Sequence, residues 1–292
     1  MIFTVRPMMR GLTPVLVVTT VAALAPSASY AGAAPRADGG LAAPDSIAAL
    51  GDSITRGFNA CGWYLDCTSR SWAAGDHASV RSHYSRILAT NPDIAGHNYN
   101  LAKSGADSRD LARQAAEAVT RKPDYVTILI GANDACAERE SNMPRPALFR
   151  RRVEQGLDVL RAGVPNARIF VSSIPDLRRL WQVGRKDGRA RAFWKLGRIC
   201  PTMLANANSD APADRARRER VRKRVMAYNA QLAAACEAYG PRCRHDGGEV
   251  FSYPFTLAQL SPWDYFHPNA QGQRLLAERT YRHGFPWTDT RA

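Results

Sequence analysis

Short, uninterrupted apolar runs recur along the chain, and segments with helical spacing of apolar positions lie between them. The runs that suit buried strands are Ser46 to Leu50, Val126 to Ile130, Ile169 to Ile174 and, more weakly, Asn98 to Leu101. Helical spacing is seen at Val80, Tyr84, Ile87 and Leu88, at Leu111, Ala115 and Val119, and at Phe149, Val153, Leu157 and Leu160. Because strands and helices alternate, the pattern predicts an α/β fold with a central parallel sheet flanked by helices.

The pattern changes after Ile174. Loop and short helix extend from there to a long amphipathic helix, whose apolar side carries Val221, Val225, Tyr228, Leu232 and Cys236. The other side of this helix carries basic residues 215–224. A final short strand is predicted at Glu249 to Phe251, before a loop and a closing helix that includes Leu275 and Leu276. No internal repeat interrupts this order, so the chain predicts one domain.

The N-terminal segment has a different pattern. Arg6 and Arg10 precede an apolar run from Leu12 to Leu24, and small residues follow at Ser29-Tyr30-Ala31. This order is typical of a secretory signal peptide, so we expect cleavage after Ala31 and a secreted, extracellular protein. An uncleaved anchor is the alternative. Residues 32–44, rich in Gly, Ala and Pro, predict a flexible leader, and residues 45–288 predict a single domain.

Six cysteines, an even number in a chain predicted to be exported, favour disulfides in an oxidising compartment over a metal site. No Cys-x-x-Cys pair is present. Six cysteines allow about 15 pairings. Proximity along the chain favours Cys61 with Cys67 and Cys236 with Cys243, which leaves Cys136 with Cys200.

The chain is basic, with a formal net charge of +14. Basic residues concentrate in residues 178–198 and 215–224. These stretches suit peripheral contact with anionic lipid or cell-wall polymer, and they also suit a solvated, arginine-rich surface. The export signal and the lack of a recognisable binding motif argue against a nucleic-acid partner. We expect a monomer.

Residues with catalytic potential follow the predicted strands. Gly51-Asp52-Ser53 comes after the first strand, Gly105 after the weak second one and residues 131–134 after the third. Asp264 and His267 come after the last strand. In an open α/β sheet, ligands bind at the carboxyl ends of the strands, where loops from different strands converge. The order along the chain therefore predicts that these residues meet.

Three of these residues have the chemistry of an activated hydroxyl nucleophile. A serine hydroxyl attacks an ester once a base removes its proton, and a carboxylate fixes the tautomer of that base. Ser53, His267 and Asp264 supply the three groups. The Asp-x-x-His spacing on a tight loop lets the carboxylate reach one ring nitrogen while the other faces the serine, although each motif alone is also a common surface accident.

The oxyanion of the tetrahedral intermediate needs donors that are already aimed at it. The backbone N–H of Ser53, the backbone N–H of Gly105 and the side-chain amide of Asn133 are the candidates. Gly105 is equally understood as a turn glycine, and Asn133 as a cap of its own loop. Asp52 and Asp134 are interpreted as scaffold, with Asp52 ordering its loop and Asp134 supporting Asn133.

Taken in order, the blocks Gly-Asp-Ser-Ile, Ser-Gly at 104–105, Gly-Ala-Asn-Asp at 131–134 and Asp-x-x-His-Pro-Asn resemble the SGNH (GDSL-like) serine hydrolases. The resemblance covers roughly residues 46–283, and its closing Trp-Asp-Tyr-Phe-His-Pro-Asn-Ala is similar to the secreted, disulfide-stapled esterases and phospholipase-like members of actinobacteria. The Ser, Gly, Asn and His of the family name map onto Ser53, Gly105, Asn133 and His267. Ile54 replaces the Leu of the GDSL motif, an exchange of one apolar residue for another.

The resemblance implies a three-layer flavodoxin-like fold, no metal or cofactor, and a nucleophile near the N-terminus of the domain. It also implies hydrolysis of carboxylic esters through an acyl-enzyme. We expect lipid or phospholipid acyl esters as substrates. A carbohydrate O-acetyl esterase is the first alternative, and a non-catalytic binder of anionic cell-surface polymer is the second.

The remaining histidines and the apolar residues after the fourth strand are interpreted as structural before a functional role is considered. No further histidine has a companion at metal-ligand spacing, a set made up of His77, His83, His97, His245 and His283. The apolar residues after the fourth strand predict a small subdomain packed on the core; they are Trp181, Phe193, Trp194, Leu196, Met203 and Leu204. The sharper hypothesis makes them a wall of an acyl-chain groove.

Overall fold

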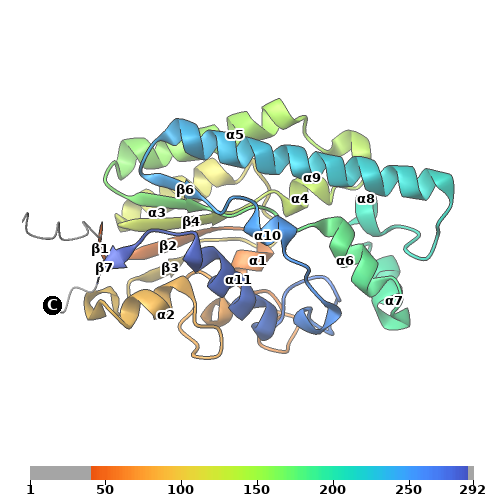
Figure 1. The fold of residues 1–292 in the computed structure, drawn as a ribbon, viewed down its shortest axis with the longest axis horizontal. Coiled ribbons are helices and arrows are strands. Elements are labelled where there is room, and N and C mark those ends of the chain that lie inside the picture. The colour runs from red at the N-terminus through yellow and green to blue at the C-terminus, as the bar shows by residue number, and fades with distance from the viewer. Residues whose placement is uncertain (1–40, 289–292) are drawn as a thin grey trace, which may run out of the picture. The chain divides into compact units, whose positions relative to one another are not determined.

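The computed structural model describes residues 41–288, and the predicted signal peptide and most of the predicted leader lie outside this range. Its core is a five-stranded parallel sheet in the order β3-β2-β4-β5-β6 (Figure 1). The strands are β2 (Ile47–Gly51), β3 (Asn98–Asn100), β4 (Tyr125–Leu129), β5 (Arg168–Val171) and β6 (Cys243–His245). The predicted parallel α/β sheet is therefore confirmed.

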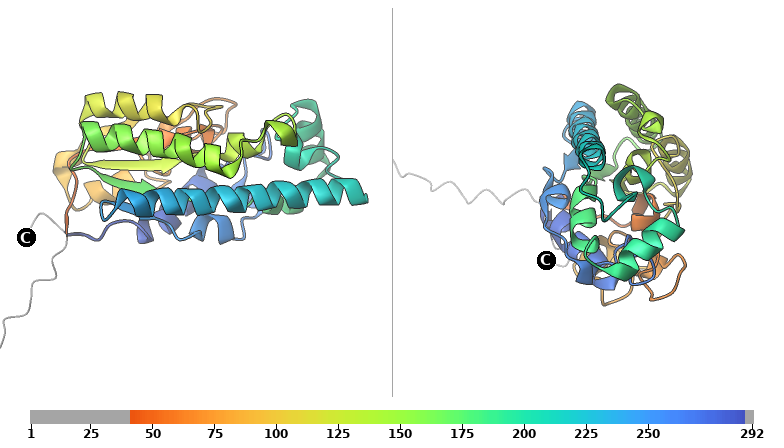
Figure 2. Two further views of the ribbon diagram at one scale, coloured as in Figure 1. Left: turned by 90° about the horizontal axis from the view of Figure 1, so that it is seen from above. Right: turned by 90° about the vertical axis from the view of Figure 1, so that its right-hand side faces the viewer.

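Helices cover both faces of this sheet, which explains why β2 and β4 are buried along their whole length. On one face, α3 (Leu111–Arg121), α5 (Pro146–Gly163) and α9 (Pro212–Tyr239) lie side by side (Figure 2). On the other face lie α2 (His83–Leu88) and α11 (Ala270–Arg282). The result is the three-layer, flavodoxin-like arrangement that the sequence predicted.

Short elements gather where the strands end. They are α1 (Ser53–Arg56), α4 (Ala132–Ala135), α6 (Leu177–Gly184), α7 (Gly188–Leu196), α8 (Pro201–Leu204) and α10 (Glu249–Ser252). Four 3₁₀ turns within residues 41–288 complete the connections, at Thr68–Arg70, Pro92–Ile94, Glu140–Asn142 and Leu257–Gln259. The carboxyl edge of the sheet, with α6, α7 and α8 beyond it, is therefore the end where loops converge (Figure 1).

The predicted strand at Glu249 to Phe251 is wrong. This segment is the short helix α10, and the fifth strand lies earlier, at Cys243–His245. Asp246 explains the difference, because its carboxylate accepts hydrogen bonds from the N–H groups of Gly248 and Val250. Although the N-cap residue itself is Gly248, these bonds satisfy N–H groups at the start of the helix and so favour a helix where the apolar pattern alone suggests a strand.

The folded part also begins earlier than Asp45. Leu41–Ala42 form strand β1, which pairs in parallel with β7 (Trp287–Thr288), and Ala43 is buried. The last residues assigned to the flexible leader therefore belong to the folded unit. None of the helices within residues 41–288 is both long enough and apolar enough to cross a bilayer.

Three disulfides staple the fold, and the pairing is the expected one. Cys61–Cys67 and Cys236–Cys243 close short loops, whereas Cys136–Cys200 joins positions 64 residues apart. The long link ties the end of α4 to the start of α8. The segment containing α6, α7 and α8 is thereby held against the carboxyl edge of the sheet.

The basic stretches are partly built into the fold. Arg218 is buried on α9, where its guanidinium lies 4.3 Å from the ring centroid of Trp181 and donates to the carbonyl oxygens of Asn206 and Ser209. Trp181 in turn donates to the carbonyl of Ala207. The solvated-surface interpretation therefore fails for Arg218, which holds the loop before α9 in place.

Candidate active site

Ser53 is the first residue of α1, directly after β2. The carboxylate of Asp52 caps this helix by accepting the N–H of Ile54 at 2.8 Å, as expected for an aspartate that orders the loop. Gln114 secures the preceding turn, because its side chain exchanges two hydrogen bonds with the backbone of Gly51. The strand end and the helix start thus hold Ser53 in a fixed position.

Ser53 and His267 meet although they lie 214 positions apart. The Oγ of Ser53 is 2.8 Å from Nε2 of His267, and Nδ1 of the same ring is 2.6 Å from Oδ2 of Asp264. A carboxylate beside Nδ1 holds the ring proton on that nitrogen, which leaves Nε2 as an acceptor for the serine hydroxyl. The three predicted residues therefore form one continuous hydrogen-bonded chain.

Asp264 is buried and fully satisfied. Its Oδ1 accepts the backbone N–H groups of Phe266 and His267, and its Oδ2 accepts the side-chain amide of Asn59 at 2.6 Å. Sequence reasoning missed Asn59. The only local signal is a non-glycine residue in a Gly-Phe-Asn turn, and Asn59 indeed has φ +65°, a conformation that asparagine tolerates well.

The three predicted oxyanion donors lie around one cavity with Ser53. Within residues 41–288, the N–H groups of Ser53 and Gly105 donate to no other group. Gly105 has φ +84°, and a Cβ built there would meet no atom within 4 Å, so the glycine is required by its backbone angle and leaves space at the cavity. Asn133 uses one amide hydrogen to bind the carbonyl of Ala106 at 2.7 Å, which leaves the second one free to donate.

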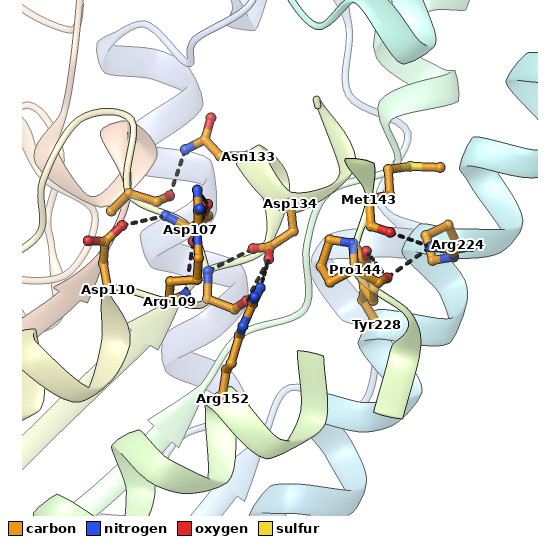
Figure 3. Close-up of polar contacts among 12 residues, drawn as sticks. Asp107, Arg109, Asp110, Asn133, Asp134, Met143, Pro144, Arg152, Arg224 and Tyr228 are labelled. Carbon is orange, nitrogen blue, oxygen red and sulfur yellow. Dashed lines mark hydrogen bonds and ion pairs between the residues drawn. The ribbon is translucent and has the colours of Figure 1, made fainter. Parts of the chain in front are cut away.

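Asp134 supports the loop after Gly105 instead of Asn133 itself. Its carboxylate accepts both the N–H and the Oγ–H of Ser108, and Arg152 approaches the same pair (Figure 3). The predicted support of Asn133 by Asp134 is therefore not a direct hydrogen bond, because the Asp134 side chain binds Ser108. Asn133 and Asp134 still act on one loop, since the first holds Ala106 and the second holds Ser108.

Burial changes the protonation of the two scaffold aspartates. It raises the pKa of Asp52 to about 7, against the opposing effects of the Ile54 N–H and of the charge of His267. One carboxylate oxygen of Asp52 has no hydrogen-bond partner. Burial likewise raises the pKa of Asp134 to about 6, although the two hydrogen bonds from Ser108 work in the opposite direction.

Ser53 opens into a cavity of about 380 Å³, called the Ser53 cavity below. Gly105, Asn133, Asp264 and His267 also line it. Its remaining walls come from the aromatic residues Phe58, Tyr64 and Phe266, from the Cys136–Cys200 disulfide, and from Ser104, Glu138, Arg198, Ile199 and Pro201. An ester bound here would have its carbonyl within reach of the hydroxyl and of the amide donors.

A second, larger cleft adjoins this cavity at Asn133 and Glu138. It measures about 810 Å³ and is called the arginine cleft here, because Arg109, Arg145, Arg151 and Arg152 line it. Arg109 pairs with Asp107. No ion pair within residues 41–288 involves Arg145 or Arg151, so these two guanidinium groups remain available to an anion.

The apolar residues after the fourth strand divide into buried and exposed ones. Trp181 and Trp194 are buried, and neither lines the Ser53 cavity, whereas Phe193 and Leu196 of the same segment are exposed. His83 is buried between the Tyr125 hydroxyl and Thr280. Across the described part of the chain, no three His, Cys, Asp or Glu side chains come together as a metal site would require.

Ser53, His267 and Asp264 thus place a hydroxyl, an imidazole and a carboxylate in one hydrogen-bonded line at the carboxyl edge of the sheet. A model of the family described as GDSL-like lipase/acylhydrolase matches residues 47–280. The chain belongs to this family.

Two groups of curated relatives are similar to the chain. It is 28% identical over 193 residues to rat membrane-associated phospholipase B1, an alignment that covers 54% of the chain and only 13% of the relative. It is 26% identical over 249 residues to an acetylxylan esterase of Geobacillus stearothermophilus, covering 83% of the chain and 95% of the relative. The chain thus spans about an eighth of phospholipase B1.

Solved structures agree on the fold. A protein of Parabacteroides merdae described as a GDSL-like lipase superimposes with a TM-score of 0.52 at 16% identity, over 83% of this chain and 97% of the other. A variant of Axe2, the acetyl-xylooligosaccharide esterase of Geobacillus, gives a TM-score of 0.51 at 18% identity, over 86% and 99%.

Proposed function

We propose that Ser53 is the nucleophile of an acyl-transfer reaction, with His267 as its base and Asp264 as the group that orients the base. Ser53 Oγ attacks the ester carbonyl while Nε2 of His267 takes the hydroxyl proton. The same nitrogen returns this proton to the departing alcohol, which leaves an acyl-serine. Water then attacks with the help of His267 and releases the acid. The observation that carries this proposal is the continuous chain of hydrogen bonds from Ser53 to Asp264 at the cavity.

The negative charge that develops on the carbonyl oxygen would be stabilised by the N–H groups of Ser53 and Gly105 and by the amide of Asn133. All three belong to residues that line the same cavity as His267. Donors held in place by the backbone need no reorganisation when the charge develops, which is the usual source of the largest catalytic effect.

For the substrate, we propose lipid acyl esters, phospholipids in particular. The arginine cleft supports this choice, because a guanidinium is well suited to a phosphate group and Arg145 and Arg151 have no acidic partner among residues 41–288. A phospholipid whose ester lies in the Ser53 cavity would carry its phosphate toward Asn133 and the cleft beyond. The similarity to phospholipase B1 agrees with this substrate class.

A carbohydrate O-acetyl ester is the second candidate. The alignment with the Geobacillus acetylxylan esterase favours it, since this alignment covers most of both chains. The two candidates differ in what lies beside the ester, which is a phosphate group in one case and a neutral sugar in the other.

We also propose that the protein is secreted. The order of basic, apolar and small residues at the N-terminus supports export, although those residues lie outside the described range. The three disulfides support it as well, because such bonds persist in oxidising compartments.

A fluorophosphonate probe followed by peptide mass spectrometry tests the nucleophile. Labelling should occur at Ser53 and disappear in Ser53→Ala, and folded protein that takes up no label would contradict the mechanism. Rates on p-nitrophenyl esters from acetyl to palmitoyl, measured beside phosphatidylcholine and acetylated xylan, test the substrate. Activity confined to acetyl esters and acetylated xylan would replace the lipid proposal by the carbohydrate one.

A further inference from the structure

Exposed hydrophobic side chains gather around the Ser53 cavity. Seven large hydrophobic residues are exposed within residues 41–288, and six of these lie on three segments that border the cavity. We call the six the rim patch; it consists of Trp63, Tyr64, Leu65, Phe193, Leu196 and Trp263. The seventh, Met226, lies on α9. Exposed hydrophobic groups scattered singly need no explanation, but a cluster of this size around one opening does.

The first part of the rim patch is a small closed loop. The Cys61–Cys67 disulfide closes residues 61–67, and this loop presents Trp63 with 65% of its surface exposed. Trp263 reaches the loop from the segment that carries Asp264: its indole N–H donates to the carbonyl of Gly62, and its ring stacks on Trp63 at 6.4 Å. The Cys61–Cys67 disulfide and the hydrogen bond from Trp263 to Gly62 therefore hold Trp63 and Trp263 in place while both remain exposed.

The same loop is coupled to the residues around His267. Tyr64 lines the Ser53 cavity, and its ring lies 5.0 Å from that of Phe58, which in turn lies 4.9 Å from the imidazole of His267. A surface that touches Trp63 and Leu65 would therefore lie next to Tyr64, a residue of the cavity wall.

The second part of the patch is on α7. Phe193 contacts the ring of Tyr265 at 5.9 Å, and Leu196, the most exposed of the six at 87%, comes just before Arg198 of the cavity wall. Helix α7 also carries Arg189, Arg191 and Lys195; Arg189 pairs with Asp187 at the start of the helix, and no ion pair within residues 41–288 involves Arg191 or Lys195. The apolar groups on this side are thus flanked by positive charge.

We propose that the rim patch is a lipid-binding surface with which the protein attaches to an anionic membrane, so that the Ser53 cavity faces the lipid. This proposal rests on the proposed lipid substrate. Tryptophan and tyrosine favour the boundary between headgroups and acyl chains, exposed leucine and phenylalanine favour the chains themselves, and arginine and lysine favour anionic headgroups. The patch and the basic residues of α7 supply all of these kinds of residue on segments that border one cavity.

A polysaccharide fits the same surface less well. Sugars stack on flat aromatic faces, whereas Trp63 and Trp263 already stack on each other and Leu65 and Leu196 have no ring. Positive charge on α7 also contributes nothing to a neutral sugar.

Flotation with vesicles made of equal parts phosphatidylcholine and phosphatidylglycerol tests the proposal. The protein carries Ser53→Ala, so that binding is measured without hydrolysis. In this background, the double change Trp63→Ala/Leu65→Ala should weaken binding about tenfold or more, because it removes two exposed apolar groups that would insert. Met226→Ala, a change of an exposed apolar residue on α9, should bind as strongly as its parent.

A second variant keeps the test independent of the closed loop. Leu196→Gln removes the most exposed apolar side chain of α7 without touching the core, and it should also weaken vesicle binding. Unfolding midpoints equal to that of the parent would show that each variant is folded. The same changes are also made in the enzyme that retains Ser53. There, the ratio of the hydrolysis rate on vesicles to the rate on a soluble monomeric ester should fall.

Equal vesicle binding by the parent and the two rim variants would overturn the proposal. So would retention on insoluble acetylated xylan in the absence of vesicle binding, or a dimer in solution that the double variant abolishes. Vesicle binding that the rim variants weaken, together with no hydrolysis of the same phospholipid by the enzyme that retains Ser53, would support the surface and refute the proposed substrate, so the two proposals fail separately.

Discussion

The side-chain amide of Asn59 and Nδ1 of His267 both lie 2.6 Å from the same oxygen of Asp264. These bonds fix the orientation of the Asp264 carboxylate toward His267, because its other oxygen accepts two backbone N–H groups. Asn59 itself is buried and does not line the Ser53 cavity. This geometry makes Asn59 a positioning residue that acts through Asp264.

We predict that Asn59→Gly lowers kcat about tenfold and leaves KM within about twofold, since the lost hydrogen bond loosens the carboxylate but not the substrate site. Glycine is the appropriate change because it tolerates the positive φ of this position. Steady-state kinetics on a soluble ester measure both constants. A rise in KM with unchanged kcat would show that the residue shapes the cavity instead.

Asn133 is predicted to contribute through its free amide hydrogen. Asn133→Ala should lower kcat by about 10²- to 10³-fold with little change in KM, because the donor acts on charge that appears only in the transition state. Asn142→Ala is a matched control, since it removes an exposed amide from the adjoining cleft. Equal losses in the two variants would indicate a general disturbance of the loop and argue against an oxyanion role.

Asp52 should make the stability of the protein depend on pH. Its pKa is about 7 in the folded state and 3.8 for an unperturbed group, so unfolding releases a proton in this window and stability falls as pH rises from about 4 to 7. Asp52→Asn removes the titratable carboxyl and, with it, this contribution to the pH dependence of stability. Urea unfolding should show the variant gaining about 2–4 kcal/mol relative to the wild type between pH 4 and pH 8. Parallel stability curves for the two proteins would contradict the raised pKa.

The Cys136–Cys200 disulfide should contribute more stability than Cys61–Cys67. It spans 64 residues instead of 6, and in the chain-entropy model the two loops correspond to about 4 and about 2 kcal/mol. Replacing each pair by serines and measuring the free energy of unfolding compares them. Loss of Cys136–Cys200 should also lower activity, because both cysteines line the Ser53 cavity. Equal losses of stability in the two double variants would show that the length of the closed loop does not determine how much each disulfide stabilises the fold.

The arginine cleft should discriminate between substrates by charge. In Arg145→Ala/Arg151→Ala, the ratio of kcat/KM for a soluble short-chain phosphatidylglycerol to that for a neutral p-nitrophenyl ester should fall about tenfold. High salt should reduce this difference, since exposed charges are screened. Arg274→Ala, a change of an exposed arginine on α11, serves as the control. An unchanged ratio in the double variant would remove the cleft from the lipid proposal.

The order of elements and the positions of Ser53, Gly105, Asn133, Asp264 and His267 could be predicted from the sequence alone. Buried parallel strands are apolar throughout, and residues at their carboxyl ends meet at one edge whatever the details of packing. Even the disulfide pairing followed from proximity along the chain. The prediction of a strand at residues 249–251 failed because hydrogen bonds to the Asp246 carboxylate favour the helix α10 over the structure that the apolar pattern suggests.

Only the tertiary structure decided which side chains complete the site. The hydrogen bond from Asn59 to Asp264 joins residues 205 positions apart, and the partner of Asp134 turned out to be Ser108 and not its neighbour Asn133. The same holds for the rim patch, in which Trp263 stacks on Trp63 and donates to the carbonyl of Gly62, a residue 201 positions away. Strand and helix patterns are local and leave periodic traces in the sequence, whereas these contacts depend on the relative placement of distant loops, which leaves none.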